Sequence, residues 1–116
     1  RTNILRHRLE DRKVTIKKIK SEVLSKYVTK AVDLLKIDVE GAESLIVEEL
    51  NKENKLRLIR NIIMEFHHNI GSKKCSFAGT LNILEKAGFS YMIAAYPRKS
   101  PVMHGMQDIM VYAYRQ

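Results

Sequence analysis

Acidic side chains and a histidine close two apolar runs of this sequence, and these residues are the best suited to chemistry. Asp38 ends the run 32–38, and Glu65 and His67 lie near the end of the run 61–68. If the two runs form neighbouring parallel strands, the backbones of Asp38 and Glu65 lie about 5 Å apart. Two carboxylates there could bind a divalent cation, position a substrate hydroxyl or act as a general base. The structural alternative is that they cap helix N-termini and bind loop amides.

His67 follows Glu65 by two residues, so both side chains point to the same side of an extended strand. Its unperturbed pKa suits proton abstraction near neutral pH. Lys36 shares a face with Asp38 by the same period, and it is either a structural partner of Asp38 or a contact for an anionic or carbonyl group.

The segment 38–43 predicts a tight turn into a helix. Gly41 permits a positive φ, and Glu43 suits the positive end of the helix that follows. For Glu43, helix capping is favoured over catalysis.

The remaining candidates are weaker. Cys75 is the only cysteine, so an internal disulfide is impossible and a reducing, cytoplasmic compartment fits. A bystander thiol is favoured over a nucleophile, because no histidine adjoins it in sequence. His7, His68 and His104 lack the spacing of zinc ligands, so no zinc site is expected and no residue is assigned as a metal ligand.

The elements that must position these residues alternate along the chain. Strands are expected over 13–19, 32–38, 61–68, 89–96 and 108–114, and helices over 21–27, 42–50 and 76–87, with a short helical turn around 56–59. This order predicts a single α/β domain over residues 1–116 with a mostly parallel sheet, whose last two strands pair antiparallel. The nearly continuous apolar run 32–37 favours a strand covered on both faces.

Charge is concentrated at the start of the chain. The 116 residues carry a formal net charge of +8, and residues 1–30, with ten Lys and Arg against three acids, account for +7 of it. A patch for an anionic partner is one interpretation. A solvated surface is favoured over nucleic-acid binding, because no aromatic residue interleaves with the basic run. No apolar run approaches the roughly 18 residues of a membrane span.

No glycine-rich phosphate or dinucleotide motif occurs in the chain. Its five glycines, Gly41, Gly71, Gly79, Gly88 and Gly105, are scattered, without G-x-G-x-x-G or P-loop spacing. A nucleotide or S-adenosylmethionine usually meets such a loop after the first strand of its domain.

The twelve residues 32–43, Val-Asp-Leu-Leu-Lys-Ile-Asp-Val-Glu-Gly-Ala-Glu, closely resemble the signature of FkbM-type methyltransferases. The resemblance continues with Met-Glu-Phe-His at 64–67 and Ala-Gly-Phe at 87–89. It covers roughly residues 13–114, about the second half of that family's catalytic domain.

The resemblance implies a class I, Rossmann-like methyltransferase fold, which is a doubly wound sheet with an antiparallel last strand, here present in part. It implies S-adenosylmethionine as cofactor and O-methylation of a small-molecule hydroxyl, often on a sugar or secondary metabolite. Asp38 would then lie at the junction of methyl donor and acceptor, with Glu65 and His67 on the acceptor side. Lys36, Asp38 and Glu40 would contact the cofactor, and Glu43 would complete the rim.

Departures from the family pattern lead to further expectations. The family's glycine-rich loop and ribose-binding acid belong to upstream strands that this chain does not contain, so residues 1–116 alone should bind S-adenosylmethionine weakly. We also expect the strand 14–19 to re-pair onto the open edge of the strand 32–38, or two chains to form a homodimer there. The alternatives from the residues alone are a non-catalytic binding module with a basic N-terminal segment, and a metal-dependent hydrolase using Asp38 and Glu65.

Overall fold

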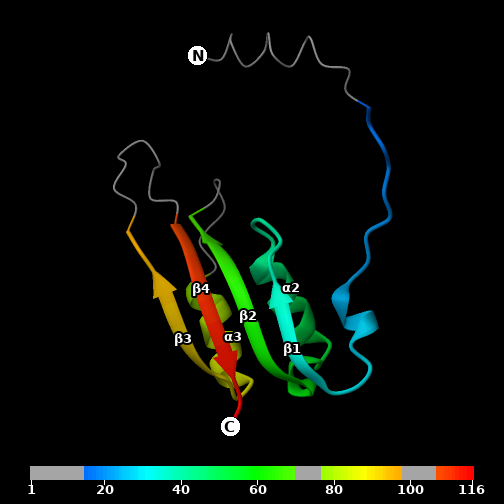
Figure 1. Ribbon diagram of the computed structural model, residues 1–116. Coiled ribbons are helices and arrows are strands. Elements are labelled where there is room, and N and C mark those ends of the chain that lie inside the picture. The colour runs from blue at the N-terminus through cyan, green and yellow to red at the C-terminus, as the bar shows by residue number, and fades with distance from the viewer. Residues whose placement is uncertain (1–14, 70–76, 98–106) are drawn as a thin grey trace.

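The computed structural model describes residues 15–69, 77–97 and 107–116 (Figure 1). Their elements, in chain order, are η1 (Leu24–Tyr27), β1 (Val32–Ile37), α2 (Glu43–Lys52), η2 (Leu56–Leu58), β2 (Ile59–His68), α3 (Phe77–Lys86), β3 (Ser90–Ala95) and β4 (Gln107–Tyr114). The alternation of strands and helices expected after residue 31 is therefore confirmed.

The four strands form one sheet in the order β1-β2-β4-β3. β1 and β2 pair in parallel, with Ile37 beside Met64, whereas β4 is antiparallel to both β2 and β3. Three strands thus run in one direction and β4 runs against them. The antiparallel pairing of the last two strands is confirmed, but only one of the three strand pairs is parallel, so the described sheet is mixed rather than mostly parallel.

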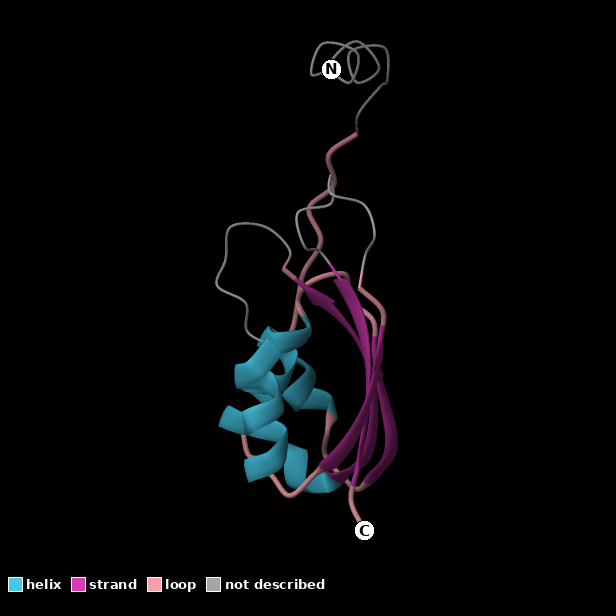
Figure 2. Cartoon of the chain, turned by 90° about the vertical axis from the view of Figure 1, so that its left-hand side faces the viewer, coloured by secondary structure: helices cyan, strands magenta, loops and turns pink. Residues whose placement is uncertain are grey.

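Both α-helices cover the same face of the sheet (Figure 2). The alternating side chains of β2 and β4 that point to this face form the core with residues of both helices; its fully buried members include Val47, Leu50, Ile62, Met64, Leu84 and Val111. Burial of these side chains is the main stabilisation of the fold.

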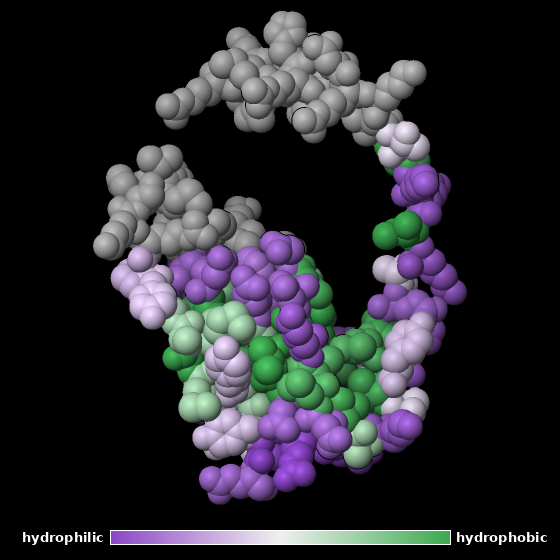
Figure 3. All heavy atoms as spheres, in the orientation of Figure 1, coloured by the Kyte–Doolittle hydropathy of each residue, from purple (hydrophilic) through white to green (hydrophobic). Residues whose placement is uncertain are grey.

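The expectation that β1 is covered on both faces is wrong for the described residues. Ile37 is buried toward the helices, but Leu34 on the opposite face is 53% exposed. Apolar residues also lie exposed farther across the sheet, at the paired residues Met92 and Tyr112. Figure 3 shows apolar surface over the strands. The apolar run is continuous because both faces of β1 carry apolar residues, although helices cover only one of these faces.

The strand expected over 14–19 does not form in residues 15–19, which are the part of this segment that the structure describes. Residues 15–19 are irregular, Ile16 and Ile19 are almost fully exposed, and Val14 lies outside the described residues. Re-pairing of this segment onto β1 is also wrong, because β1 ends the sheet order and pairs only with β2 among the described residues. Alternating apolar residues favour a strand, but a strand forms only where a neighbour supplies hydrogen bonds.

The helix expected over 21–27 is shorter, being the single 3-10 turn η1 without a side-chain cap. The backbone N–H of Ser25 donates to Glu49 of α2 at 3.2 Å, which holds this turn against the helix. None of the helices in the described ranges combines the length and apolar character that a bilayer crossing requires.

The C-terminus is anchored by Arg115. Its guanidinium donates to the carbonyl oxygens of Leu56, Ile59 and Ala87 and lies 4.0 Å from the ring centroid of Phe89. This one side chain thereby joins the segments that enter β2 and β3.

Candidate active site

The turn between β1 and α2 has the backbone conformation that its sequence predicts. Gly41 has φ +113°, and the preceding Glu40 also lies in the left-handed region, at φ +55°. Non-glycine residues adopt that region infrequently, and such strain persists where surrounding contacts hold it. The turn places Glu43 at the first position of α2, beside the end of β2.

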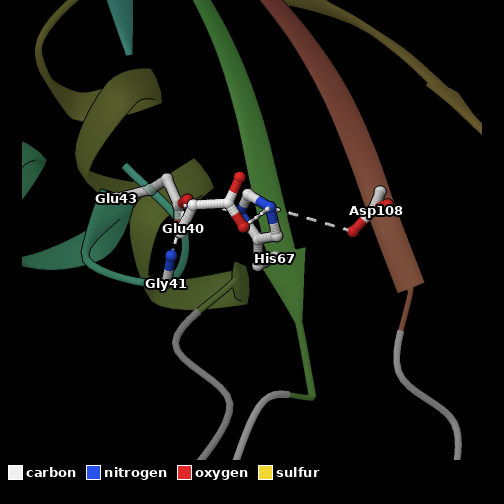
Figure 4. Close-up of polar contacts among 5 residues, drawn as sticks. All are labelled: Glu40, Gly41, Glu43, His67 and Asp108. Atoms are coloured by element: carbon white, nitrogen blue, oxygen red, sulfur yellow. Dashed lines mark hydrogen bonds and ion pairs between the residues drawn. The ribbon is translucent and has the colours of Figure 1, made fainter. Parts of the chain in front are cut away.

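Glu43 is almost fully buried, with 1% of its side chain exposed. Its Oε1 accepts a hydrogen bond from the Gly41 amide at 2.9 Å and lies 2.5 Å from Nδ1 of His67 (Figure 4). Burial raises the pKa of Glu43, but hydrogen bonds from the Gly41 and Glu43 amides and from His67 outweigh it, so the pKa is below its ordinary value. Glu43 is therefore a buried carboxylate that fixes the orientation of His67.

His67 is the centre of the site. Its side chain is 8% exposed, and its Nε2 lies 3.4 Å from Oε2 of Glu40 and 4.0 Å from Oδ1 of Asp108. Burial lowers the pKa of His67, but the hydrogen bond and charge of Glu43, followed by the charges of two further carboxylates, outweigh it and raise the pKa above its ordinary value. When Nδ1–H donates to Glu43, Nε2 of the neutral ring is free to accept a proton.

The structure brings most of the residues predicted from sequence around this ring. Potential ligand atoms of Asp38, Glu40 and His67 lie within 4.8 Å of one another, and so do those of Glu65, His67 and Asp108. Asp38 and Glu65 follow the paired residues Ile37 and Met64 in the register, as expected for neighbouring parallel strands. His67 belongs to both groups, so Asp38 and Glu65 both lie near its ring.

Lys36 lies apart from this cluster. It is exposed, and within the described ranges it forms no ion pair with Asp38. Its interpretation as the structural partner of Asp38 is therefore not supported. Cys75, His7 and His104 lie outside the described residues.

Two features of the site were not predicted, namely the contact of the rim residue Glu43 with His67 and the presence of Asp108. Glu43 was interpreted as a helix cap, and its contact with His67 depends on how closely α2 approaches the end of β2. Asp108 is paired with His67 in the β2–β4 register. The acid at the start of the last strand was visible in the sequence, but only the position of β4 beside β2 gives it a place in the site.

An apolar groove of about 480 Å³ adjoins β1. It is lined by residues of η1, β1, α2 and the turn between β1 and α2, among them Leu24, Leu35, Val39, Leu45 and Glu49. Oε1 of Glu49 is buried without a hydrogen-bond partner among the described residues. Val39 and Ala42 bring the groove to the turn that carries Glu40.

The family model described as Methyltransferase FkbM domain matches residues 2–91, more than three quarters of the chain. The chain belongs to the FkbM methyltransferase family. The match includes β1, α2, β2 and α3, and hence every site residue except Asp108. Searches of curated proteins and of solved structures find no match to this FkbM-family chain.

Proposed function

We propose that this FkbM-family chain transfers a methyl group from S-adenosylmethionine to a hydroxyl of a small molecule, with His67 as general base. The observation that carries this proposal is the contact of Glu43 with Nδ1 of His67, which leaves Nε2 facing the strand ends. A carboxylate that binds one ring nitrogen fixes the tautomer in which the other nitrogen accepts a proton. Ligands of open α/β sheets bind outside the carboxyl ends of the strands, where this ring lies.

In the proposed reaction the acceptor hydroxyl donates its proton to Nε2 of His67 as its oxygen takes the methyl group. The bond between the methyl carbon and the donor's sulfur breaks, and the donor would leave as a neutral thioether. Glu43 stabilises the imidazolium that forms, since it remains ionised in its buried position. A base of this kind contributes a factor of about 100 to 10,000 in rate. The remaining acceleration comes from alignment of donor and acceptor.

Asp38 and Glu65 are proposed to hold the acceptor beside His67. Carboxylates accept hydrogen bonds from hydroxyls, and two of them near one histidine suit an acceptor with several hydroxyl groups, such as a sugar or a hydroxylated secondary metabolite. Asp38 and Glu65 each reach the vicinity of His67, in different groups of ligand atoms.

The residues near the turn fit the methyl donor. S-adenosylmethionine supplies an electrophilic methyl group on a positively charged sulfur. The exposed carboxylates of Asp38 and Glu40 complement its cationic groups, Lys36 complements its carboxylate, and the apolar groove beside Val39 suits a flat ring. Because the chain has no glycine-rich loop, we expect binding of the donor by residues 1–116 to be weak.

The proposal is tested by methyl transfer from isotopically labelled S-adenosylmethionine to a panel of polyhydroxylated acceptors, at saturating donor. His67→Gln should lower kcat by about 100-fold or more. His68→Gln, which changes the adjacent histidine of β2, is the matched control and should retain activity. Equal activity of the His67→Gln chain and the unchanged chain would contradict a base role for His67.

Glu43 is proposed as a positioning residue, so its variant needs a separate measurement. Glu43→Gln should lower kcat about 10-fold to 100-fold, the range found for carboxylates that orient histidines, with little change in the KM of the acceptor. A purely structural role predicts instead a lower melting temperature with unchanged kcat in the folded fraction.

We also infer that two copies associate through the open edge of β1. Among the described residues no strand pairs with that edge, which adjoins an apolar groove, and such edges favour strand pairing. Light scattering should show a dimer that Leu35→Pro converts to a monomer; a monomer at every concentration would contradict the inference. The cytoplasmic location and the single domain over 1–116 stay predictions from sequence.

A further inference from the structure

A second use of Nε2 of His67 follows from the oxygen atoms that surround it. Asp38 and Glu40 offer carboxylate oxygens that lie, together with a nitrogen of His67, within 4.8 Å of one another. Figure 4 shows the Glu40 carboxylate next to the His67 ring. An ion with metal–ligand bonds of about 2.0–2.6 Å holds its ligand atoms up to about 4–5 Å apart.

The burial and fixed orientation of His67 distinguish this cluster from ordinary surface acids. Its side chain is more than nine-tenths buried, and its Nδ1 is held by the buried Glu43. Nε2 makes no hydrogen bond within the described ranges: its contact with Glu40 is 3.4 Å, beyond the usual N–H···O range of about 2.7–3.2 Å. The ring is therefore held in one orientation, with Nε2 facing the exposed carboxylate of Glu40 at a distance that a bound ion can bridge.

We propose that Asp38, Glu40 and His67 bind a divalent cation of the Mn²⁺ class. Carboxylate oxygens suit Mg²⁺, Ca²⁺ and Mn²⁺, whereas an imidazole nitrogen favours transition metals, so the mixed set selects Mn²⁺ over Mg²⁺. The Glu43–His67 contact is the arrangement that orients metal-binding histidines in other proteins, with a carboxylate on the nitrogen that does not bind the metal.

The side of His67 that the cation occupies follows from the distances. Glu40 provides the nearest oxygen to Nε2, and its side chain is 84% exposed, so it can close on an ion without disturbing the core. Asp108 is farther, at 4.0 Å, and makes a further interaction of its own. The spacing of histidines in the sequence did not predict this site, because its carboxylates come from another strand and a turn.

This inference goes beyond the proposed methyl transfer and does not depend on it. A cation on Nε2 takes the lone pair that a general base needs, so the bound cation and the base cannot use the ring at the same time. The cation should therefore inhibit methyl transfer as it fills the site.

The test is direct binding of Mn²⁺ to the full chain, measured by loss of the electron paramagnetic resonance signal of aqueous Mn²⁺. His67→Gln should weaken binding about 10-fold or more, and Glu43→Gln should weaken it about 10-fold to 100-fold. Mg²⁺ should compete only at concentrations about 10-fold or more above those of Mn²⁺. His68→Gln is the control and should bind Mn²⁺ like the unchanged chain.

Because His67 is buried, its variant could fail to fold, so Asp38→Asn provides a second measurement. Asp38 is exposed, its variant should keep the circular dichroism spectrum, and it should weaken Mn²⁺ binding about 10-fold. Absence of Mn²⁺ binding at millimolar concentration, or equal binding by the Asp38→Asn and unchanged chains, would overturn the proposal. Neither result bears on methyl transfer, because the methyl-transfer assay with donor and acceptor is run in the presence of a chelator that removes divalent cations.

Discussion

Replacement of Arg115 by alanine should destabilise the fold by about 3–4 kcal/mol. Each hydrogen bond from a charged donor contributes about 1.5–3 kcal/mol when its partner is buried, and somewhat less where water can replace it. Arg115 is half-buried and satisfies the carbonyl oxygens of Leu56, Ile59 and Ala87, at 2.9, 3.0 and 2.5 Å. Its position 4.0 Å over the Phe89 ring adds about 0.5–1 kcal/mol.

The assay is urea unfolding followed by circular dichroism. With a slope of about 1–3 kcal/mol per molar urea, the loss shifts the midpoint by about 1–4 M. Arg115→Lys keeps the charge but presents a single ammonium group in place of the planar fork, so it should recover no more than about half of the loss. Arg60→Ala is the matched control: Arg60 is an exposed arginine of the neighbouring strand, and its loss should stay within about 0.5 kcal/mol.

The contribution of the ring contact can be measured separately. A double-mutant cycle of Arg115→Ala with Phe89→Leu should give a coupling energy of about 0.5–1 kcal/mol. A cost of Arg115→Ala no larger than that of Arg60→Ala would refute the reasoning, since it would mean that water satisfies the three carbonyls equally well.

Three further stability changes follow from single positions and are measured by the same urea titration. Gly88→Ala should destabilise the fold by about 1–3 kcal/mol, because Gly88 has φ +93° and an added Cβ would lie 2.8 Å from Nη1 of Arg115. In an Arg115→Ala background the clash is removed, so only the cost of the backbone strain should remain. An unchanged cost in that background would contradict the clash. Thr80→Val should be neutral or stabilise by up to about 1 kcal/mol, since the buried hydroxyl of Thr80 has no hydrogen-bond partner among the described residues; a loss above about 1 kcal/mol would show that the hydroxyl is satisfied. Glu40→Gly should leave stability unchanged or raise it by up to about 1 kcal/mol, because Glu40 has φ +55°, while it weakens Mn²⁺ binding; a large loss of stability would instead assign Glu40 a structural role.

The sequence by itself determined most of the elements after residue 31. Apolar runs, the polar residues that follow them and the stop at Gly88 are local signals, so they located β1, α2, β2 and α3 to within a few residues. The same signals identified Gly41 as a turn residue with positive φ. They failed at residues 15–19, where the pattern of a strand is present but no neighbouring strand supplies hydrogen bonds.

The tertiary structure decided which polar residues form the site. Asp38, Glu65 and His67 stood out because each lies near the end of an apolar run, and the parallel pairing of β1 with β2 brings those ends together. The roles of Glu43 and Asp108 could not be read in this way, because they depend on the approach of α2 to β2 and on the insertion of β4 next to β2. Local patterns fix where an element begins and ends, whereas long-range packing fixes which elements are neighbours, and only the second brings a buried carboxylate to within 2.5 Å of the His67 ring.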